Sequence, residues 1–217
     1  MEHGASCMSV TVTRWWWVRH APVTDDGGRF YGQADLEADT GDFAAHRALA
    51  EALPPDAVWV SSHLRRTHQT AAAIGAAGYP LPEVAHHRDL AEQHFGDWQG
   101  TPRAPAYEKH GGFYGFWMSV LDKAPPNGES FNDLRRRIGA AVQRLSAAHR
   151  GRDIVAVAHG GTIRAALVGA FDLPSAMALS LTIGNSSLTQ MDLVEEPGRR
   201  ARWMLNLLNG YGVAGLR

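Results

Sequence analysis

A continuous apolar run at residues 154–158 restricts the fold of this chain more than any other stretch. The run reads IVAVA, is preceded by Asp153 and is ended by the sequence HGG at 159–161. It is too short for a buried helix, and its β-branched residues favour a strand. A strand that is apolar on both faces is typical of a parallel sheet, because crossover helices then cover both sides. This stretch therefore predicts an α/β fold.

Alternating strand-like and helix-like segments surround this run. Strands are predicted at 10–18, 57–60 and 83–87, and late strands at 178–183, 187–194 and 202–208. Helices are predicted at 40–53, 64–77, 130–151 and 162–171, with a partly helical insertion at about 95–125. Alternation of this kind predicts a three-layer αβα sandwich with a mostly parallel central sheet. We expect one domain over residues 1–217.

Composition excludes several classes of protein. The chain has 217 residues and a net charge of −1, so it has no strong attraction for nucleic acid or an anionic membrane. Cys7 is its only cysteine, which excludes a disulfide framework and a thiolate metal cluster. We expect no membrane-spanning segment and no signal peptide, hence a cytoplasmic location. Residues 1–9 are expected to be a flexible leader, with Met8 as an alternative start to Met1.

Polar motifs follow three of the predicted strands. Arg19 and His20 end the first strand, Ser62 ends the second and is followed by Arg66, and His159 ends the run described above. In open α/β sheets, ligands bind beyond the carboxyl ends of the strands. Two histidines, two arginines and a helix N-terminus at one edge would suit a dianion, above all a phosphoryl group.

A carboxyl group is expected to join this edge. Glu92 lies in the stretch LAEQHFGDWQG at 90–100, among aromatic residues. An apolar setting raises the pKa of a carboxyl group, which would let Glu92 act as a general acid near neutral pH.

Five motifs, in order along residues 12–190, resemble those of the histidine phosphatase superfamily, the phosphoglycerate mutase-like group. They are Arg19-His20, the sequence SHLRRTHQTA at 62–71, the stretch at 90–100, GES at 128–130 and HGGTIR at 159–164. The resemblance implies a phosphoglycerate mutase-like fold, with the insertion lying over the site. One such motif is weak evidence, but five in family order are strong.

The resemblance also implies the role of each residue. His20 would be the nucleophile and form a phosphohistidine, while Arg19, Arg66 and His159 would hold the phosphoryl oxygens. Glu92 would protonate the leaving oxygen and then help water attack. Further substrate contacts are predicted at Gly160, Ser62, Tyr31 and Gln33. No metal or other cofactor is expected, because arginine neutralises the phosphoryl charge.

The substrate is less constrained than the chemistry. Ala21-Pro22-Val23 replaces the family's common Gly-Glu-Thr, at positions that border the substrate rather than the phosphoryl group. The run from Arg19 to Asp35 is most similar to small α-ribazole phosphatases and related broad-specificity phosphatases. We therefore expect a phosphomonoester hydrolase that acts on a small phosphorylated metabolite. A mutase-type phosphoryl transferase is the alternative, an inactive phosphate-binding protein is disfavoured, and a homodimer is left open.

Other features receive structural interpretations. The tryptophans at 15–17 are expected to fill the core on both faces of a central strand. The three arginines at 135–137 are expected on a solvated helix face, and Ser61 or Ser62 is expected to cap the helix at 64–77. His86, His87 and His94 match no metal-ligand spacing.

Overall fold

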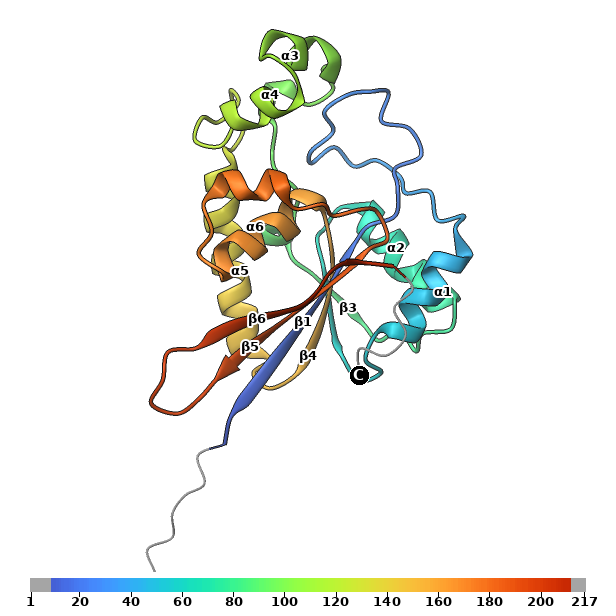
Figure 1. Ribbon diagram of the computed structural model, residues 1–217. Helices are drawn as coiled ribbons and strands as arrows, with labels where there is room; N and C mark the ends of the chain where they lie inside the picture. The colour runs from blue at the N-terminus through green and yellow to red at the C-terminus, as the bar shows by residue number, and fades with distance from the viewer. Residues whose placement is uncertain (1–8, 212–217) are drawn as a thin grey trace, which may run out of the picture.

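A six-stranded sheet lies between two layers of helices in the computed structural model, which describes residues 9–211 (Figure 1). The strands are β1 Thr11–Arg19, β2 Val58–Ser61, β3 Val84–His86, β4 Asp153–Ala158, β5 Leu188–Glu195 and β6 Arg202–Gly210. Their order is β3-β2-β4-β1-β5-β6. The first four strands in the chain pair in parallel, and β5 and β6 add antiparallel pairings on one side. The predicted α/β class is confirmed.

Four helices form the two outer layers. α1 Phe43–Ala52 and α2 Arg65–Ala76 cover one face of the sheet, and α5 Phe131–Ala148 and α6 Gly160–Ala170 cover the other. The tryptophans of β1 join both layers, because successive side chains of a strand point to opposite faces. Trp15 and Trp17 are fully buried in the α5 and α6 layer, and Trp16 is buried in the α1 and α2 layer. This confirms the prediction that the run fills the core on both faces.

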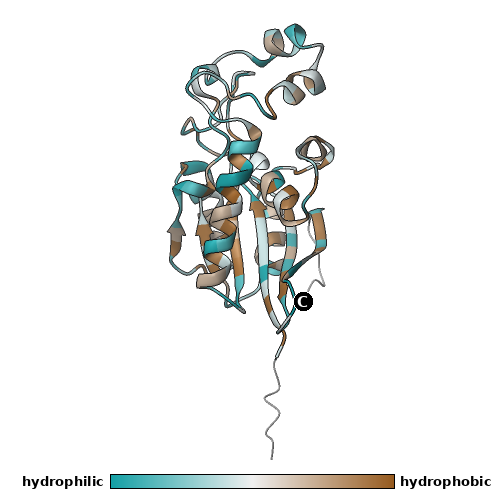
Figure 2. Ribbon diagram, turned by 90° about the vertical axis from the view of Figure 1, so that its left-hand side faces the viewer, coloured by the Kyte–Doolittle hydropathy of each residue, from teal (hydrophilic) through white to brown (hydrophobic). Residues whose placement is uncertain are grey.

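The insertion stands beyond the carboxyl ends of the parallel strands, as Figure 2 shows. It contains the short 3-10 helix η2 Gly96–Trp98 and then α3 Arg103–Lys109 and α4 Phe113–Ser119, which we call the cap. Another 3-10 helix, η1 Arg88–Leu90, precedes the insertion. Aromatic ring contacts attach the cap to the rest of the molecule. The ring centroids of Phe30 and Phe116 lie 4.9 Å apart, and those of Phe30 and Phe95 lie 5.6 Å apart. The predicted insertion over the site is confirmed.

Three local predictions need correction or fall outside the structure. The predicted strand at 178–183 is wrong, because η3 Ser175–Ser180 is a 3-10 helix that begins after Pro174, and 181–183 pairs with no strand. The predicted serine cap is also wrong, because α2 begins after Leu64 without a side-chain cap. The predicted leader lies outside the described residues except for its last position. Between residues 9 and 211, no helix is long and apolar enough to cross a membrane.

Candidate active site

Neighbouring strand ends bring the predicted residues together. Arg19 closes β1 opposite Ala158 of β4, and the backbone N–H of His20 donates to the Ala158 carbonyl at 2.9 Å. His159 directly follows β4, and Ser62 directly follows β2, its neighbour in the sheet. The parallel register thus gathers side chains that are far apart in the sequence.

His20 is a buried imidazole that is neutral and fixed in one tautomer. Only 1% of the residue is exposed, and its Nδ1 lies 2.6 Å from the carbonyl oxygen of Ala21. A carbonyl can only accept, so Nδ1 carries the proton and Nε2 keeps its lone pair. Burial, followed by the charges of Arg66 and Arg19, holds the pKa of His20 well below its usual range. The imidazole is therefore neutral at neutral pH.

His159 is fixed from both sides of its ring. Its Nδ1 accepts from Nε of Arg66 at 3.2 Å, so the neutral ring carries its proton on Nε2 and donates to Oγ of Ser62 at 2.7 Å. The rings of His159 and His20 lie 5.1 Å apart. Burial, then the charge of Arg66, holds the pKa of His159 well below its usual range. Ser62, predicted as a substrate contact, orients this ring.

Arg66 joins the histidine pair to the loop before α1. Arg66 is fully buried, and its two terminal nitrogens donate to the carbonyls of Ala34 and Gly32, each at 2.7 Å. The Tyr31 ring lies 5.2 Å from the guanidinium carbon. Burial lowers the pKa of Arg66, against the opposing charge of Glu92. Arg66 thus fixes the loop that carries Tyr31.

Glu92 lies against the N-terminus of α6. Its carboxylate accepts from the backbone N–H of Gly161 at 3.1 Å and from that of Gln93 at 2.9 Å. A Cβ atom at position 161 would lie only 2.2 Å from the carboxylate, so this approach requires glycine. The second glycine of the HGG motif therefore makes room for the carboxyl group.

The loop that carries Glu92 is held by a residue that we expected on a solvated face. Arg137 of α5 donates to the carbonyls of Asp89 and Ala91, at 3.0 and 3.1 Å, and to that of Glu92 at 3.2 Å. It also pairs with Glu129, whose side chain is only 16% exposed. Gln33, predicted to touch substrate, donates to the same Glu92 carbonyl at 2.8 Å. The surface interpretation is wrong for Arg137, since it lies on the same helix face as buried residues three before and four after it.

Replacing Arg137 by methionine should loosen this loop. Loss of one partner of a largely buried, hydrogen-bonded ion pair costs about 2–4 kcal/mol, so we expect the free energy of unfolding to fall by about that amount. Urea denaturation measures it. The matched change Arg136→Met, at a side chain that is 77% exposed, should stay within about 0.5 kcal/mol of the unchanged protein. Equal losses in both variants would contradict this role of Arg137.

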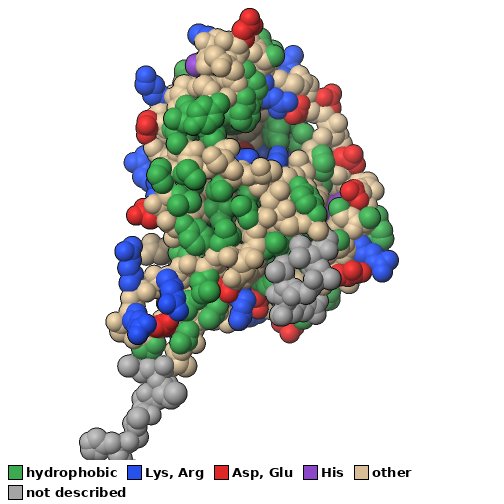
Figure 3. Space-filling model, viewed as in Figure 1, with side chains coloured by type: hydrophobic (Ala, Val, Ile, Leu, Met, Phe, Trp, Pro, Cys, Tyr) green, Lys and Arg blue, Asp and Glu red, His purple; other side chains and the backbone are tan. Residues whose placement is uncertain are grey.

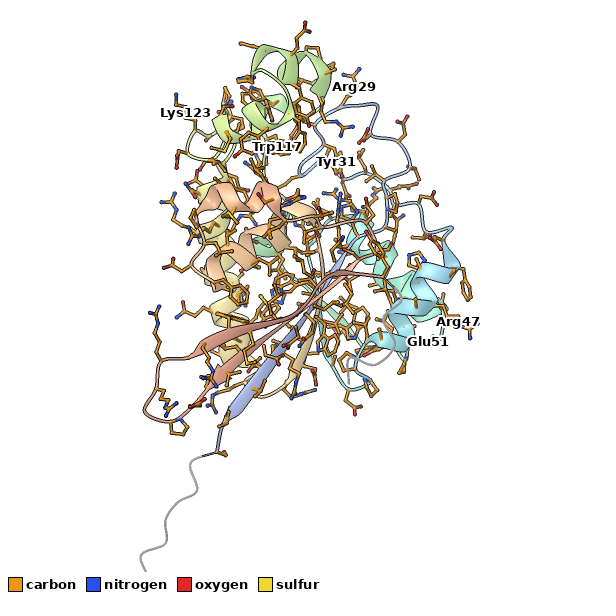
Figure 4. All side chains as sticks on the ribbon, viewed as in Figure 1. Arg29, Tyr31, Arg47, Glu51, Trp117 and Lys123 are labelled. Carbon is orange, nitrogen blue, oxygen red and sulfur yellow. The ribbon has the colours of Figure 1, made fainter. Side chains whose placement is uncertain are left out.

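A cavity of about 320 Å³ opens between the strand ends and the cap. Its inner end is lined by Arg19, Glu92, Gly160 and Arg164, and its outer walls by the aromatic residues Phe30, Tyr31, Phe95, Tyr107, Phe113 and Trp117. Figure 3 shows basic and acidic side chains at the base of this hollow, with hydrophobic ones around it. Figure 4 shows Tyr31 and Trp117 between the cap and the sheet. The cavity thus has a charged end and an aromatic end.

Cations at the charged end come from arginine. No three His, Cys, Asp or Glu side chains within residues 9–211 are grouped so as to hold a metal ion. His86, one of the loop histidines, instead hydrogen-bonds Ser61 at 2.8 Å and stacks on His68. Arg103, on the outer wall, pairs with Asp26 at 2.7 Å and lowers the pKa of that carboxyl group. Arg164 is the last residue of the HGGTIR motif at 159–164, and the sequence predicts no role for it.

The structure thus places a buried histidine beside two arginines at the carboxyl ends of parallel strands in an α/β fold. The chain belongs to the histidine phosphatase superfamily (branch 1), whose family model matches residues 15–206. This confirms the predicted family.

Relatives of the chain include named phosphatases. It is 35% identical over 155 residues to a metal-independent phosphoserine phosphatase of Arabidopsis thaliana; the match covers 68% of this chain but 64% of that protein, less than two thirds of its length. It is 33% identical over 199 residues to a glucosyl-3-phosphoglycerate phosphatase of Mycobacterium tuberculosis, covering 84% and 87% of the two chains. The solved structure of mycobacterial hydrolase 2 has a TM-score of 0.79 at 32% identity, covering 95% and 94%.

Proposed function

We propose that this chain is a metal-independent phosphomonoester hydrolase that works through a phosphohistidine at His20. The observation that carries the proposal is the hydrogen bond from Nδ1 of His20 to the Ala21 carbonyl, which leaves the Nε2 lone pair available. Arg19 and Arg66 provide positive charge next to this nitrogen. Phosphoryl transfer needs mainly such positioning and charge neutralisation.

The reaction has two steps. In the first, Nε2 of His20 bonds to phosphorus, the bond from phosphorus to the substrate oxygen breaks, and Glu92 gives that oxygen a proton. In the second, water attacks phosphorus, the phosphorus–nitrogen bond breaks, and the Glu92 carboxylate takes a proton from the water. Splitting the transfer at a nucleophile makes each step easier. A mutase-type transferase would use the same groups but protect the phosphohistidine from water.

The substrates named for the relatives share one skeleton. In phosphoserine and in glucosyl-3-phosphoglycerate, the phosphoryl oxygen is on a CH₂ group next to a carbon that bears a carboxylate. The two compounds differ in the other substituent on that carbon, an amino group or a glucosyloxy group. We propose this class for the present chain, with the variable substituent in the aromatic end of the cavity. The expected α-ribazole phosphate-like substrate, the cytoplasmic location and a homodimer stay predictions.

Phosphate release from p-nitrophenyl phosphate tests the proposed hydrolase. We expect turnover to be unchanged by EDTA, because arginine supplies the site's positive charge. Vanadate should inhibit in competition with the substrate, since it mimics the phosphoryl group in the same pocket. Loss of activity in EDTA that a divalent ion restores would contradict the metal-independent mechanism. Transfer of the phosphoryl group to an acceptor without release of phosphate would favour the mutase.

A further inference from the structure

Arg164 is a cation at the inner end of the cavity that the two-step reaction does not use. It lies one turn into α6, and helical side chains lean toward the N-terminus of their helix, so Arg164 reaches back over Gly160. A Cβ atom built on Gly160 would lie 3.3 Å from Nη1 of Arg164 and 3.4 Å from Nε of Arg19. The two guanidinium groups therefore flank a single glycine.

The segment at 181–183 holds both arginines in place. Nε of Arg164 donates to the carbonyl of Leu181 at 2.8 Å, and Nη1 of Arg19 donates to that of Ile183 at 2.5 Å. Each side chain is anchored at one nitrogen and keeps other N–H groups, while both residues line the cavity. A ligand in the cavity would therefore meet two guanidinium groups held in fixed positions.

Among the described residues, the nearest opposing charge to these cations is that of Glu92, which acts on Arg164 without an ion pair. Within the described part of the chain, neither Arg19 nor Arg164 forms an ion pair with a carboxylate. Burial, then the charge of Arg19, lowers the pKa of Arg164. Like charges so close together are costly unless an anion offsets them. The arrangement is therefore complementary to a ligand rich in negative charge.

A phosphoryl group alone leaves part of this charge unmatched. Arg19 and Arg164 line the cavity, Arg66 lies fully buried behind its wall, and Arg103 on the outer wall is already paired with Asp26. Three unpaired positive charges therefore lie at this end, and Glu92 is the one acidic side chain on the cavity wall among the described residues. In the first step Glu92 must hold the proton that it donates, so it is neutral. Three cations then face a dianionic phosphoryl group, and one positive charge remains for a second anion on the substrate.

We propose that Arg164 binds the carboxylate of the substrate and so selects phosphoesters that carry a carboxylate close to the phosphate. This inference rests on the proposed function and deepens it, because it assigns the shared part of the substrate skeleton to one residue. Arg19 then serves the phosphoryl group, and Arg164, on the other side of Gly160, serves the carboxylate.

Matched pairs of substrates test this role. 3-Phosphoglycerate and glycerol 3-phosphate differ in a carboxylate against a hydroxymethyl group, and phosphoserine and phosphoethanolamine differ in the carboxylate alone. We expect the protein to have the higher kcat/KM for the carboxylate member of each pair. Arg164→Gln should reduce that preference by about ten- to a hundredfold, the range for a charge-assisted hydrogen bond. Arg164→Lys, which keeps the charge, should restore part of it.

A control variant and two contrary results decide the role of Arg164. Arg47→Gln, on an exposed ion pair of α1 that points away from the cavity in Figure 4, should leave the preference unchanged. A parallel loss on both members of each pair, with weaker vanadate inhibition, would assign Arg164 to the phosphoryl group and overturn the proposal. So would the absence of any carboxylate preference in the unchanged protein. Failure to hydrolyse even p-nitrophenyl phosphate would instead contradict the proposed function.

Discussion

Replacing His20 by alanine is expected to lower kcat by at least about a thousandfold, because the substitution removes the only nucleophile that the two-step reaction has. The backbone hydrogen bond from His20 to Ala158 does not depend on the side chain, so the strand end should keep its place. Rates of p-nitrophenyl phosphate hydrolysis measure the loss. A second readout is the covalent intermediate: ³²P-labelled substrate should leave an acid-labile label on the unchanged protein and none on His20→Ala.

His46 offers a matched control for this change. It is a histidine that is also 1% exposed, but it lies in α1 rather than at the carboxyl end of a strand. His46→Ala should cost stability, as the loss of a buried side chain does, yet each folded molecule should keep its turnover. Thermal unfolding of both variants separates the two effects. Turnover that persists in folded His20→Ala would remove His20 as the nucleophile.

The sequence predicts an element well where its pattern of apolar residues is compatible with only one type of secondary structure and one degree of burial. The run at 154–158 is apolar at every position, and β4 Asp153–Ala158 is buried between two neighbouring strands. Parallel strands then bring their carboxyl ends to one edge, which is why Arg19, His20, Ser62 and His159 meet. The geometry required no information beyond the strand ends.

The failures occur where tertiary partners decide the outcome. The stretch at 178–183 alternates as a strand does, but its first half belongs to the 3-10 helix η3, and the carbonyls of Leu181 and Ile183 accept from Arg164 and Arg19. A charge run such as 135–137 normally faces water, and only the loop at 88–94, distant in the sequence, makes Arg137 an inward residue. The helical spacing of Arg137 from Leu134 was a signal for this, whereas nothing in the sequence indicated its carbonyl partners.

The second large effect is expected for Glu92→Gln. Glutamine has the same shape and can still accept the N–H of Gly161, so the loop and α6 should stay in place. It cannot donate the proton that an alkyl oxygen needs as its bond to phosphorus breaks. General acid catalysis contributes about a hundredfold to ten-thousandfold, so hydrolysis of alkyl phosphates such as 3-phosphoglycerate should slow by that factor. p-Nitrophenolate leaves without a proton, and its release should slow far less.

The ratio of the two rates, rather than either rate alone, identifies the proton donor. A damaged site would slow both substrates together, whereas a missing proton slows only the poor leaving group. Glu108→Gln, at an exposed position of α3, should change neither rate. The nearby alternatives, His94 and Asp97, do not line the cavity, and Asp97 hydrogen-bonds Asn127 at 3.0 Å. Equal slowing of both substrates in Glu92→Gln would therefore reduce Glu92 to a positioning residue and leave the donor to be sought at the cavity wall, where Tyr31 and Tyr107 carry hydroxyl groups.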